Sequence, residues 1–170
     1  MLRSTRLAPA GRLEPDARGR SGGEETLTTA RPEPRPPLPA PDPLTSFFWE
    51  AARRRRLAIL RCDDCGWYVH WPRPVCKRCR SFSLTPTEVS GRGTLYSWTV
   101  GMQAFHPWFE DRLPYLLAVV ELEEQANLKL ITNLVECDEA QVEIGMALEV
   151  TFEVVSPELT LPMFRPAQGA

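Results

Sequence analysis

The 170-residue sequence has few of the groups that enzymes use for catalysis and lacks a long apolar segment. Only two histidines occur, His70 and His106, and no GxSxG, HExxH or phosphate-loop pattern is found. The longest aliphatic run, Leu116–Val120, is far shorter than the roughly 20 residues of a membrane-spanning helix. The first residues contain no apolar core of a signal peptide. We therefore expect a cytoplasmic protein that does not span a membrane and is not an enzyme on its own.

Net charge is also small, at −2, but it is unevenly distributed along the chain. Residues 44–87 contain 9 Lys and Arg against 3 acids, whereas residues 88–170 contain 4 against 13. An acidic domain repels the phosphates of a nucleic acid, which normally supply much of the binding energy. Nucleic-acid binding is therefore the less favoured function, although the basic part is able to contact a polyanion.

Residues 1–43 hold nine of the seventeen prolines. Proline fixes φ and has no amide N–H, so this composition favours extended conformations over helix or sheet. The few large apolar residues of the segment follow no regular period. We expect residues 1–43 to be a disordered Pro/Arg-rich tail, with order beginning near Pro43 and a short second tail at residues 167–170.

A short helix is predicted directly after this tail, at the start of residues 44–87. Thr45 or Ser46 has the side chain of a typical N-cap. The apolar stripe of the helix would consist of Phe47, Phe48, Ala51 and Ala52.

Four cysteines, Cys62, Cys65, Cys76 and Cys79, have the spacing Cys-x2-Cys-x10-Cys-x2-Cys. Each CxxC pair forms a tight knuckle, and the hairpin between the pairs brings both knuckles to one metal ion. Zinc bound by four thiolates is tetrahedral and closed to substrate, so it stabilises the fold and does not catalyse. We predict one structural Zn²⁺ per chain, in preference to a redox pair or an iron site. The fifth cysteine, Cys137, is predicted to be a plain thiol.

Residues beyond Arg80 contain candidate strands separated by turn signals, which is typical of a small all-β domain. A helical turn is predicted at Cys137–Ala140, before the last strand. This pattern suits a five-stranded Greek-key barrel of the OB type over residues 88–166, and the same periodicity allows another small barrel or a sandwich. The fold class is therefore mainly β. The candidate strands are Phe82–Val89, Gly93–Phe105, Tyr115–Leu122, Leu128–Val135 and Ala147–Val155.

Several stretches occur in an order that is familiar from other proteins: FFWEAARRRRLAILRCDDCGWYVHWPRPVCKRC, VSGRGTLYSWTV, YLLAVVEL, ITNLVECDEAQVEIGMALEVTFE and LPMFRP. Together they resemble a bacterial and archaeal family of small proteins in which a rubredoxin-like zinc ribbon precedes an acyl-CoA-associated OB-fold. The resemblance covers about residues 44–166 and places the family's ribbon cysteines on the four named above. The turn Glu123–Asn127 departs from the family, which usually has a glycine there.

The resemblance implies a non-catalytic accessory or scaffold subunit. Members of the family typically accompany thiolase-like enzymes, including lipid-transfer-type thiolases and aldolases of steroid side-chain degradation. Others accompany MaoC-type enoyl-CoA hydratases or hydroxymethylglutaryl-CoA synthase. The expected partner is therefore a thiolase-superfamily enzyme in a hetero-oligomer, with a MaoC-type hydratase as the alternative. A contribution to the partner's acyl-CoA channel is a further expectation.

Aromatic and basic residues outside the cysteine cluster are candidates for contacts with the partner or with acyl-CoA. Exposed aromatic side chains commonly mark interfaces, and basic side chains bind phosphates through charge-assisted hydrogen bonds. The alternatives are that the aromatic residues plug the barrel and that the basic residues form a solvated surface. The candidates are Phe48, Trp49, Arg73, Lys77, His106, Trp108 and Phe109.

Overall fold

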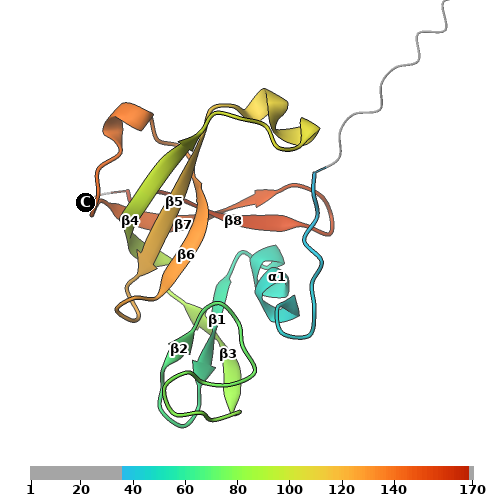
Figure 1. The fold of residues 1–170 in the computed structure, drawn as a ribbon, viewed down its shortest axis with the longest axis vertical. Helices are drawn as coiled ribbons and strands as arrows, with labels where there is room; N and C mark the ends of the chain where they lie inside the picture. The colour runs from blue at the N-terminus through green and yellow to red at the C-terminus, as the bar shows by residue number, and fades with distance from the viewer. Residues whose placement is uncertain (1–35, 169–170) are drawn as a thin grey trace, which may run out of the picture. The chain divides into compact units, whose positions relative to one another are not determined.

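The computed structural model describes residues 36–168, which form a short helix, a three-stranded sheet and a closed barrel of five strands (Figure 1). This arrangement confirms the mainly β fold class and the small five-stranded barrel. The predicted tail over residues 1–43 lies mostly outside the described residues. Within the described residues, no helix is long and apolar enough to cross a membrane.

Helix α1 (Ser46–Arg53) confirms the predicted apolar stripe. Ala51 and Ala52 are buried, and Phe47 and Phe48 pack against two different groups of buried residues. Phe47 contacts the small core beside the cysteines, and Phe48 contacts the core of the barrel. The helix therefore lies where the two cores meet.

The N-terminus of α1 is arranged differently from the prediction. Thr45 takes the N-cap position, but its side chain makes no capping bond to the helix. Its hydroxyl donates to the carboxylate of Asp42 at 2.7 Å, and the same carboxylate accepts the Thr45 N–H at 2.8 Å. Asp42 therefore fixes the turn that leads into the helix.

Strand β1 (Leu57–Cys62) is the centre of the three-stranded sheet, with β2 (Tyr68–Val69) on one side and β3 (Leu84–Val89) on the other. Both neighbours are antiparallel to it. Since successive side chains of a strand point to opposite faces, β1 serves two cores. Leu57 and Ile59 belong to the core of the barrel, whereas Leu60 and Cys62 belong to the core beside the other cysteines.

The first strand assigned to the barrel, Phe82–Val89, was placed wrongly. Its ordered part is β3, which pairs with β1 from Leu57↔Val89 to Cys62↔Leu84 and not with a barrel strand. Because β3 lies at the edge of its sheet, Pro86 is tolerated within it.

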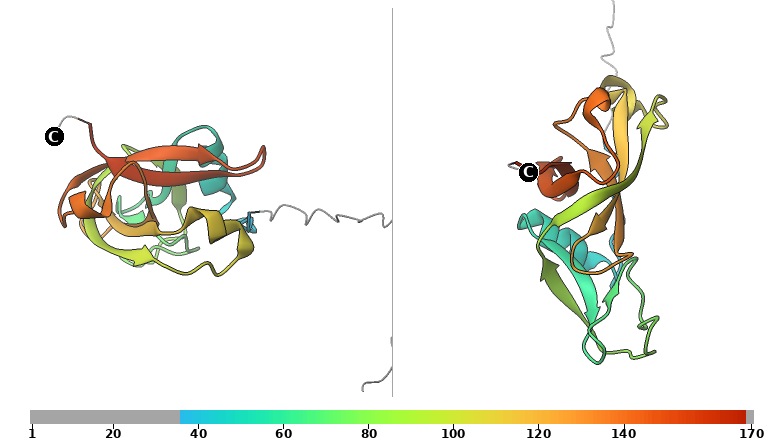
Figure 2. Two further views of the ribbon diagram at one scale, coloured as in Figure 1. Left: turned by 90° about the horizontal axis from the view of Figure 1, so that it is seen from above. Right: turned by 90° about the vertical axis from the view of Figure 1, so that its left-hand side faces the viewer.

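The barrel consists of β4 (Arg92–Gly101), β5 (Tyr115–Leu122), β6 (Lys129–Leu134), β7 (Ala147–Val154) and β8 (Thr160–Pro166), closed in the order β4-β5-β6-β8-β7 (Figure 2). Two short 3₁₀ helices interrupt it, η1 (Pro107–Arg112) before β5 and η2 (Glu139–Gln141) before β7. The second of these confirms the predicted helical turn. Buried apolar side chains from all five strands fill the interior.

The fifth barrel strand is β8, which was not among the candidate strands. Two prolines in its sequence argue against a central strand, yet β8 pairs with β7 along its whole length. Its pairing with β6 is limited to Leu134↔Phe164. Pro162 explains this limit: its carbonyl faces β6 and accepts a hydrogen bond from the Thr132 hydroxyl at 3.0 Å, but proline has no N–H to offer on that side.

Strand β4 ends at Gly101 and not at Phe105 as predicted. Its pairing with β5 ends at Gly101↔Tyr115, because Pro114 has no N–H to continue the ladder. The chain then leaves the sheet and leads into η1.

The conformation of the β5–β6 turn explains how this chain folds without the glycine that the family usually has there. Asn127 has a φ of +63°, the left-handed conformation that a glycine usually supplies. Within the same turn, the Gln125 side chain accepts the Tyr68 N–H at 2.8 Å and donates to the Tyr68 carbonyl at 3.2 Å. This pair of hydrogen bonds joins the barrel to β2.

Phe164 in β8 is predicted to be essential for stability, because it is completely buried in the barrel core. We expect Phe164→Ala to lower the free energy of unfolding by about 3–5 kcal/mol. The matched control is Val154→Ala on the neighbouring strand, where the side chain is 61% exposed and the expected change is within about 0.5 kcal/mol. Denaturant unfolding of the zinc-loaded protein measures both. Equal effects of the two variants would contradict the assignment of β8 to the core.

Candidate metal centre and adjoining apolar surfaces

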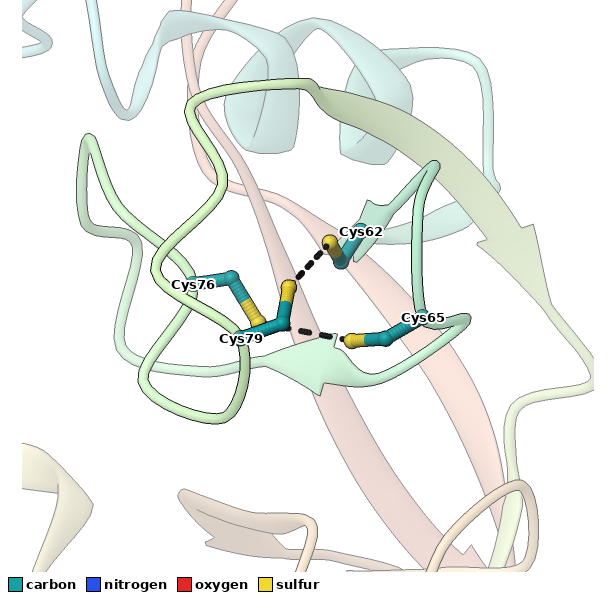
Figure 3. Close-up of side chains that lie close together, drawn as sticks. All are labelled: Cys62, Cys65, Cys76 and Cys79. Carbon is teal, nitrogen blue, oxygen red and sulfur yellow. Dashed lines mark hydrogen bonds between the residues drawn. The ribbon is translucent and has the colours of Figure 1, made fainter.

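The sulfurs of Cys62, Cys65, Cys76 and Cys79 all lie within 4.8 Å of one another and are turned toward a common point (Figure 3). Cys62 Sγ is 3.5 Å from Cys79 Sγ, and Cys65 Sγ is 3.7 Å from Cys76 Sγ. A tetrahedral zinc ion with bonds of about 2.3 Å separates its sulfur ligands by about 3.8 Å. The donor set and its spacing therefore fit zinc.

Each CxxC knuckle is held by the same backbone hydrogen bonds. The Cys62 carbonyl accepts the Gly66 N–H at 2.9 Å, and the Cys76 carbonyl accepts the Arg80 N–H at 2.9 Å. Gly66 and Arg80 occupy equivalent positions and both are left-handed, with φ of +72° and +66°. The second knuckle thus places an arginine where the first has the more suitable glycine.

The thiols are close enough to perturb one another. The backbone N–H of Cys79 stabilises the Cys76 thiolate and lowers the pKa of Cys76 to about 7. At Cys79 the Ser81 N–H acts in the same direction, but the neighbouring thiols and burial outweigh it and raise the pKa of Cys79 to about 12. A divalent cation among the four sulfurs would offset their mutual repulsion and allow all four to ionise.

Trp67 connects the two knuckles to the basic residues around them. The guanidinium of Arg78 lies 5.1 Å from the centre of the Trp67 ring, and the Lys77 ammonium lies 5.8 Å from it. Both basic side chains are exposed. The candidate contact residue Lys77 is therefore on the outer surface of the cysteine-rich segment.

Cys137 lies apart from this cluster. It is half-buried against the core of the barrel, where desolvation raises the pKa of its thiol. Its environment is that of an ordinary packed cysteine.

A hollow of about 270 Å³ is bounded by α1, the segment after β2 and the open side between β6 and β8. Two of the candidate contact residues, Phe48 and Trp49, line it. Arg73 is exposed directly after the lining residue Pro72. The lining residues are Thr45, Phe48, Trp49, His70, Trp71, Pro72, Leu130, Ile131, Thr132, Asn133, Leu161, Pro162 and Met163.

His70 contributes an uncharged ring to this wall. Burial lowers the pKa of His70 to about 4, so the imidazole is neutral at physiological pH. Its ring stacks on Trp71 with centroids 4.6 Å apart, and its buried Nε2 has no hydrogen-bond partner among the described residues. The side chain is part of an aromatic surface and is not a charged site.

A second hollow of about 500 Å³ includes the candidates Trp108 and Phe109 of η1. Both rings are half-buried: Arg112 lies 3.7 Å over the Trp108 ring, and Phe109 packs near Tyr115. The candidate His106 caps η1, because its Nδ1 accepts the Trp108 N–H at 3.2 Å.

Two apolar side chains of the preceding loop, Met102 and Phe105, are exposed, whereas the candidates Trp108 and Phe109 are half-buried. Neither was among the candidate contacts. The sequence signal that could have identified them is Gly101, where the strand ends. Apolar side chains beyond the last paired residue have no place in the sheet.

These features define a class of protein in which a four-cysteine ribbon shares a strand with the core of a small barrel. Residues 49–85 match the family model of the ChsH2 rubredoxin-like zinc ribbon domain, and residues 86–153 match that of the ChsH2 C-terminal OB-fold domain. The chain belongs to the DUF35 family of ChsH2-type zinc-ribbon and OB-fold proteins. The predicted family and its structural zinc ribbon are thereby confirmed.

Among curated relatives, a probable enoyl-CoA hydratase alpha subunit of Thermomonospora curvata is 42% identical over 82% of this chain and 43% of its own length. A DUF35 domain-containing scaffold protein of Methanocaldococcus jannaschii is 30% identical over 69% of this chain and 82% of its own length. The 3-oxo-4,17-pregnadiene-20-carboxyl-CoA hydratase alpha subunit of Mycobacterium tuberculosis is 32% identical over 72% of this chain and 37% of its own length. The chain thus spans less than half the length of the two hydratase subunits.

A chain of the solved Ltp2-ChsH2(DUF35) aldolase is 43% identical to this one, with a TM-score of 0.69. The match covers 76% of this chain and 98% of that chain.

Zinc content provides a direct test of the cluster. We expect one zinc ion per chain by elemental analysis, and loss of that ion together with unfolding of the ribbon in Cys62→Ser and in Cys79→Ser. Cys137→Ser is the control, because Cys137 is not part of the cluster, and it should keep its zinc. Stoichiometric zinc in both cluster variants would refute the assignment.

The two left-handed knuckle positions predict opposite effects of substitution. Arg80→Gly should stabilise the zinc-loaded ribbon by about 0.5–1 kcal/mol, because the left-handed conformation costs a residue with a Cβ about 1–2 kcal/mol. Gly66→Ala should destabilise it by about 1 kcal/mol for the same reason. Thermal unfolding and competition with a chelator measure the two effects. The reverse ranking would show that these backbone conformations do not limit stability.

Proposed function

We propose that this chain is a non-catalytic accessory subunit of an acyl-CoA-processing complex, whose catalytic partner is a thiolase-like aldolase of the Ltp2 type acting in steroid side-chain degradation. The observation that carries the proposal is the 43% identity to the DUF35 chain of the Ltp2-ChsH2 aldolase over 98% of that chain. The steroid assignment draws support from the pregnadiene-carboxyl-CoA hydratase subunit, which is 32% identical to this chain.

The chemistry of the described residues supports a subunit without its own catalysis. His106 uses Nδ1 to cap η1, and His70 is neutral and buried in an aromatic wall. Neither is placed as a general base beside a nucleophile. With Cys62, Cys65, Cys76 and Cys79 as its four ligands, zinc would have no open position for substrate. The metal would therefore stabilise the ribbon only.

The solved aldolase complex supports a lyase partner, since the match covers 98% of its DUF35 chain at 43% identity. Two other relatives are hydratase alpha subunits, of which the match covers 43% and 37%. A companion of a MaoC-type hydratase is the second candidate, because these two relatives carry the hydratase name.

A contribution to the acyl-CoA channel is part of the same proposal. The exposed basic side chains of the ribbon, such as Lys77, are the groups suited to the phosphates of CoA. The acidic barrel has the opposite charge and is unsuited to them.

Co-purification tests the proposal. Co-expressed with an Ltp2-type enzyme of the same organism, the chain should elute with it as one hetero-oligomer in size-exclusion chromatography, and the aldolase activity should depend on its presence. A MaoC-type hydratase from the same organism serves as the comparison. Separate elution of two folded proteins, with full activity of the Ltp2-type enzyme alone, would refute the proposed function. Co-elution with the hydratase instead would favour the second candidate.

A further inference from the structure

The hollow beside α1 owes its opening to the sequence of β8. Because Pro162 has no N–H, β8 cannot donate a backbone hydrogen bond to β6 at this residue, and the two strands separate there. The Thr132 hydroxyl takes the Pro162 carbonyl as its partner, which leaves the inner surface of the gap without a free polar group at that point. The gap between β6 and β8 therefore follows from the amino-acid sequence of β8.

Large apolar side chains remain exposed at the rim of this hollow. Trp71 is 60% exposed and Ile131 is 58% exposed, although both line the hollow. Two polar side chains of the wall are already engaged: the Thr132 hydroxyl donates to the Pro162 carbonyl and the Asn133 amide donates to the Leu116 carbonyl at 3.2 Å. The buried Nε2 of His70 remains without a partner among the described residues. An occupant would therefore be recognised mainly by its apolar surface.

The size of the hollow indicates what kind of occupant it suits. Sites for small molecules and cofactors typically measure about 300–1,000 Å³, and this hollow, at about 270 Å³, lies at the lower end of that range. The same volume suits one or two large side chains inserted from another protein. A tryptophan at the rim is also the residue type most often found at the centre of a protein–protein contact.

Two arginines that have no ion-pair partner among residues 36–168 lie close in sequence to lining residues of the hollow. Arg53 follows the lining residues Thr45 and Trp49 at intervals of four on α1, which places all three on one face of the helix. Arg73 comes directly after the lining residue Pro72. Among residues 36–168, neither arginine forms a salt bridge, unlike Arg92, which pairs with Glu123 at 2.7 Å. Guanidinium groups so close in sequence to lining residues are suited to carboxylates on an occupant.

We propose that this hollow seats a segment of the catalytic partner that inserts one or two large apolar side chains between Trp71 and Ile131 and sets carboxylates against Arg53 and Arg73. The inference rests on the proposed function, because it assigns the partner's docking site. The ribbon and the barrel both contribute to this surface, so the partner would recognise the assembled pair and neither part alone.

Binding of the Ltp2-type enzyme of the same organism to full-length, zinc-loaded variants tests the docking site. We expect Trp71→Ala and Ile131→Lys each to raise the Kd at least tenfold. Phe82→Ala is the control for aromatic exposure: Phe82 is 79% exposed on the ribbon but does not line the hollow, and its loss should leave the Kd within twofold.

Charge reversal tests the contribution of the two arginines. Arg53→Glu and Arg73→Glu should each weaken binding of the partner about tenfold and reduce the dependence of binding on salt. Arg54→Glu is the control, because it carries the same charge change at the C-terminus of α1 on a different face. Zinc content and circular dichroism establish that every variant is folded.

The outcomes separate this inference from the proposed function. Loss of binding in the four hollow variants, with both controls unchanged, supports the docking site. If the unaltered chain binds but the hollow variants bind equally well, the docking site is refuted and the proposed function stands. If the unaltered chain does not bind at all, the proposed function itself fails. A dimer of the isolated chain that Trp71→Ala dissociates would assign the hollow to a second copy and overturn the proposal.

Discussion

The two-sided burial of β1 is the constraint on which the rest of the molecule depends. Leu57 and Ile59 on one face fill the barrel core, while Leu60 and Cys62 on the other face complete the ribbon core. A ribbon of this size buries too little apolar surface to be stable alone, so it depends on its metal and on its neighbour. Because one strand carries both a cysteine of the cluster and two residues of the barrel core, the two cores are joined through β1. The hydrogen bonds between Gln125 and Tyr68 support the same junction from the turn between β5 and β6.

The barrel is closed in topology but not uniformly paired, and this has consequences for function. Pro162 prevents a continuous ladder between β6 and β8, and α1 and the segment after β2 border the gap without filling it. The proposed accessory role requires a surface for the partner, and here the surface is shaped by a missing backbone donor. The basic ribbon and the acidic barrel adjoin at β1, which belongs to the ribbon sheet and contributes Leu57 and Ile59 to the core of the barrel. A partner that spans the junction therefore contacts surfaces of opposite sign, which favours one orientation of docking.

Several elements were predictable because their signals are local. The cysteine spacing specifies a tetrahedral site through chain geometry alone, and the apolar stripe of α1 follows from helical periodicity. The strands were harder to assign, because a strand's residues do not specify its partner. Leu84–Val89 has the composition of any short strand, yet it pairs with β1 and not with the barrel. Thr160–Pro166 contains two prolines and lacks the usual strand pattern, yet it places Phe164 in the centre of the core. Its open side toward β6 is what makes those prolines acceptable.

The mainly β class, the four-cysteine cluster, the family and the lack of a recognisable catalytic motif could all be predicted, because each depends on residue type and short-range spacing. Which strands share a sheet, which aromatic side chains are exposed and where the hollow lies became known from the fold. From the sequence, Trp108 and Phe109 could belong either to an interface or to a plug of the barrel, and they are half-buried. Trp71 and Ile131 are exposed at the rim of the hollow. Exposure depends on contacts between residues far apart in the chain, such as Thr132 with Pro162, and local sequence does not record those contacts.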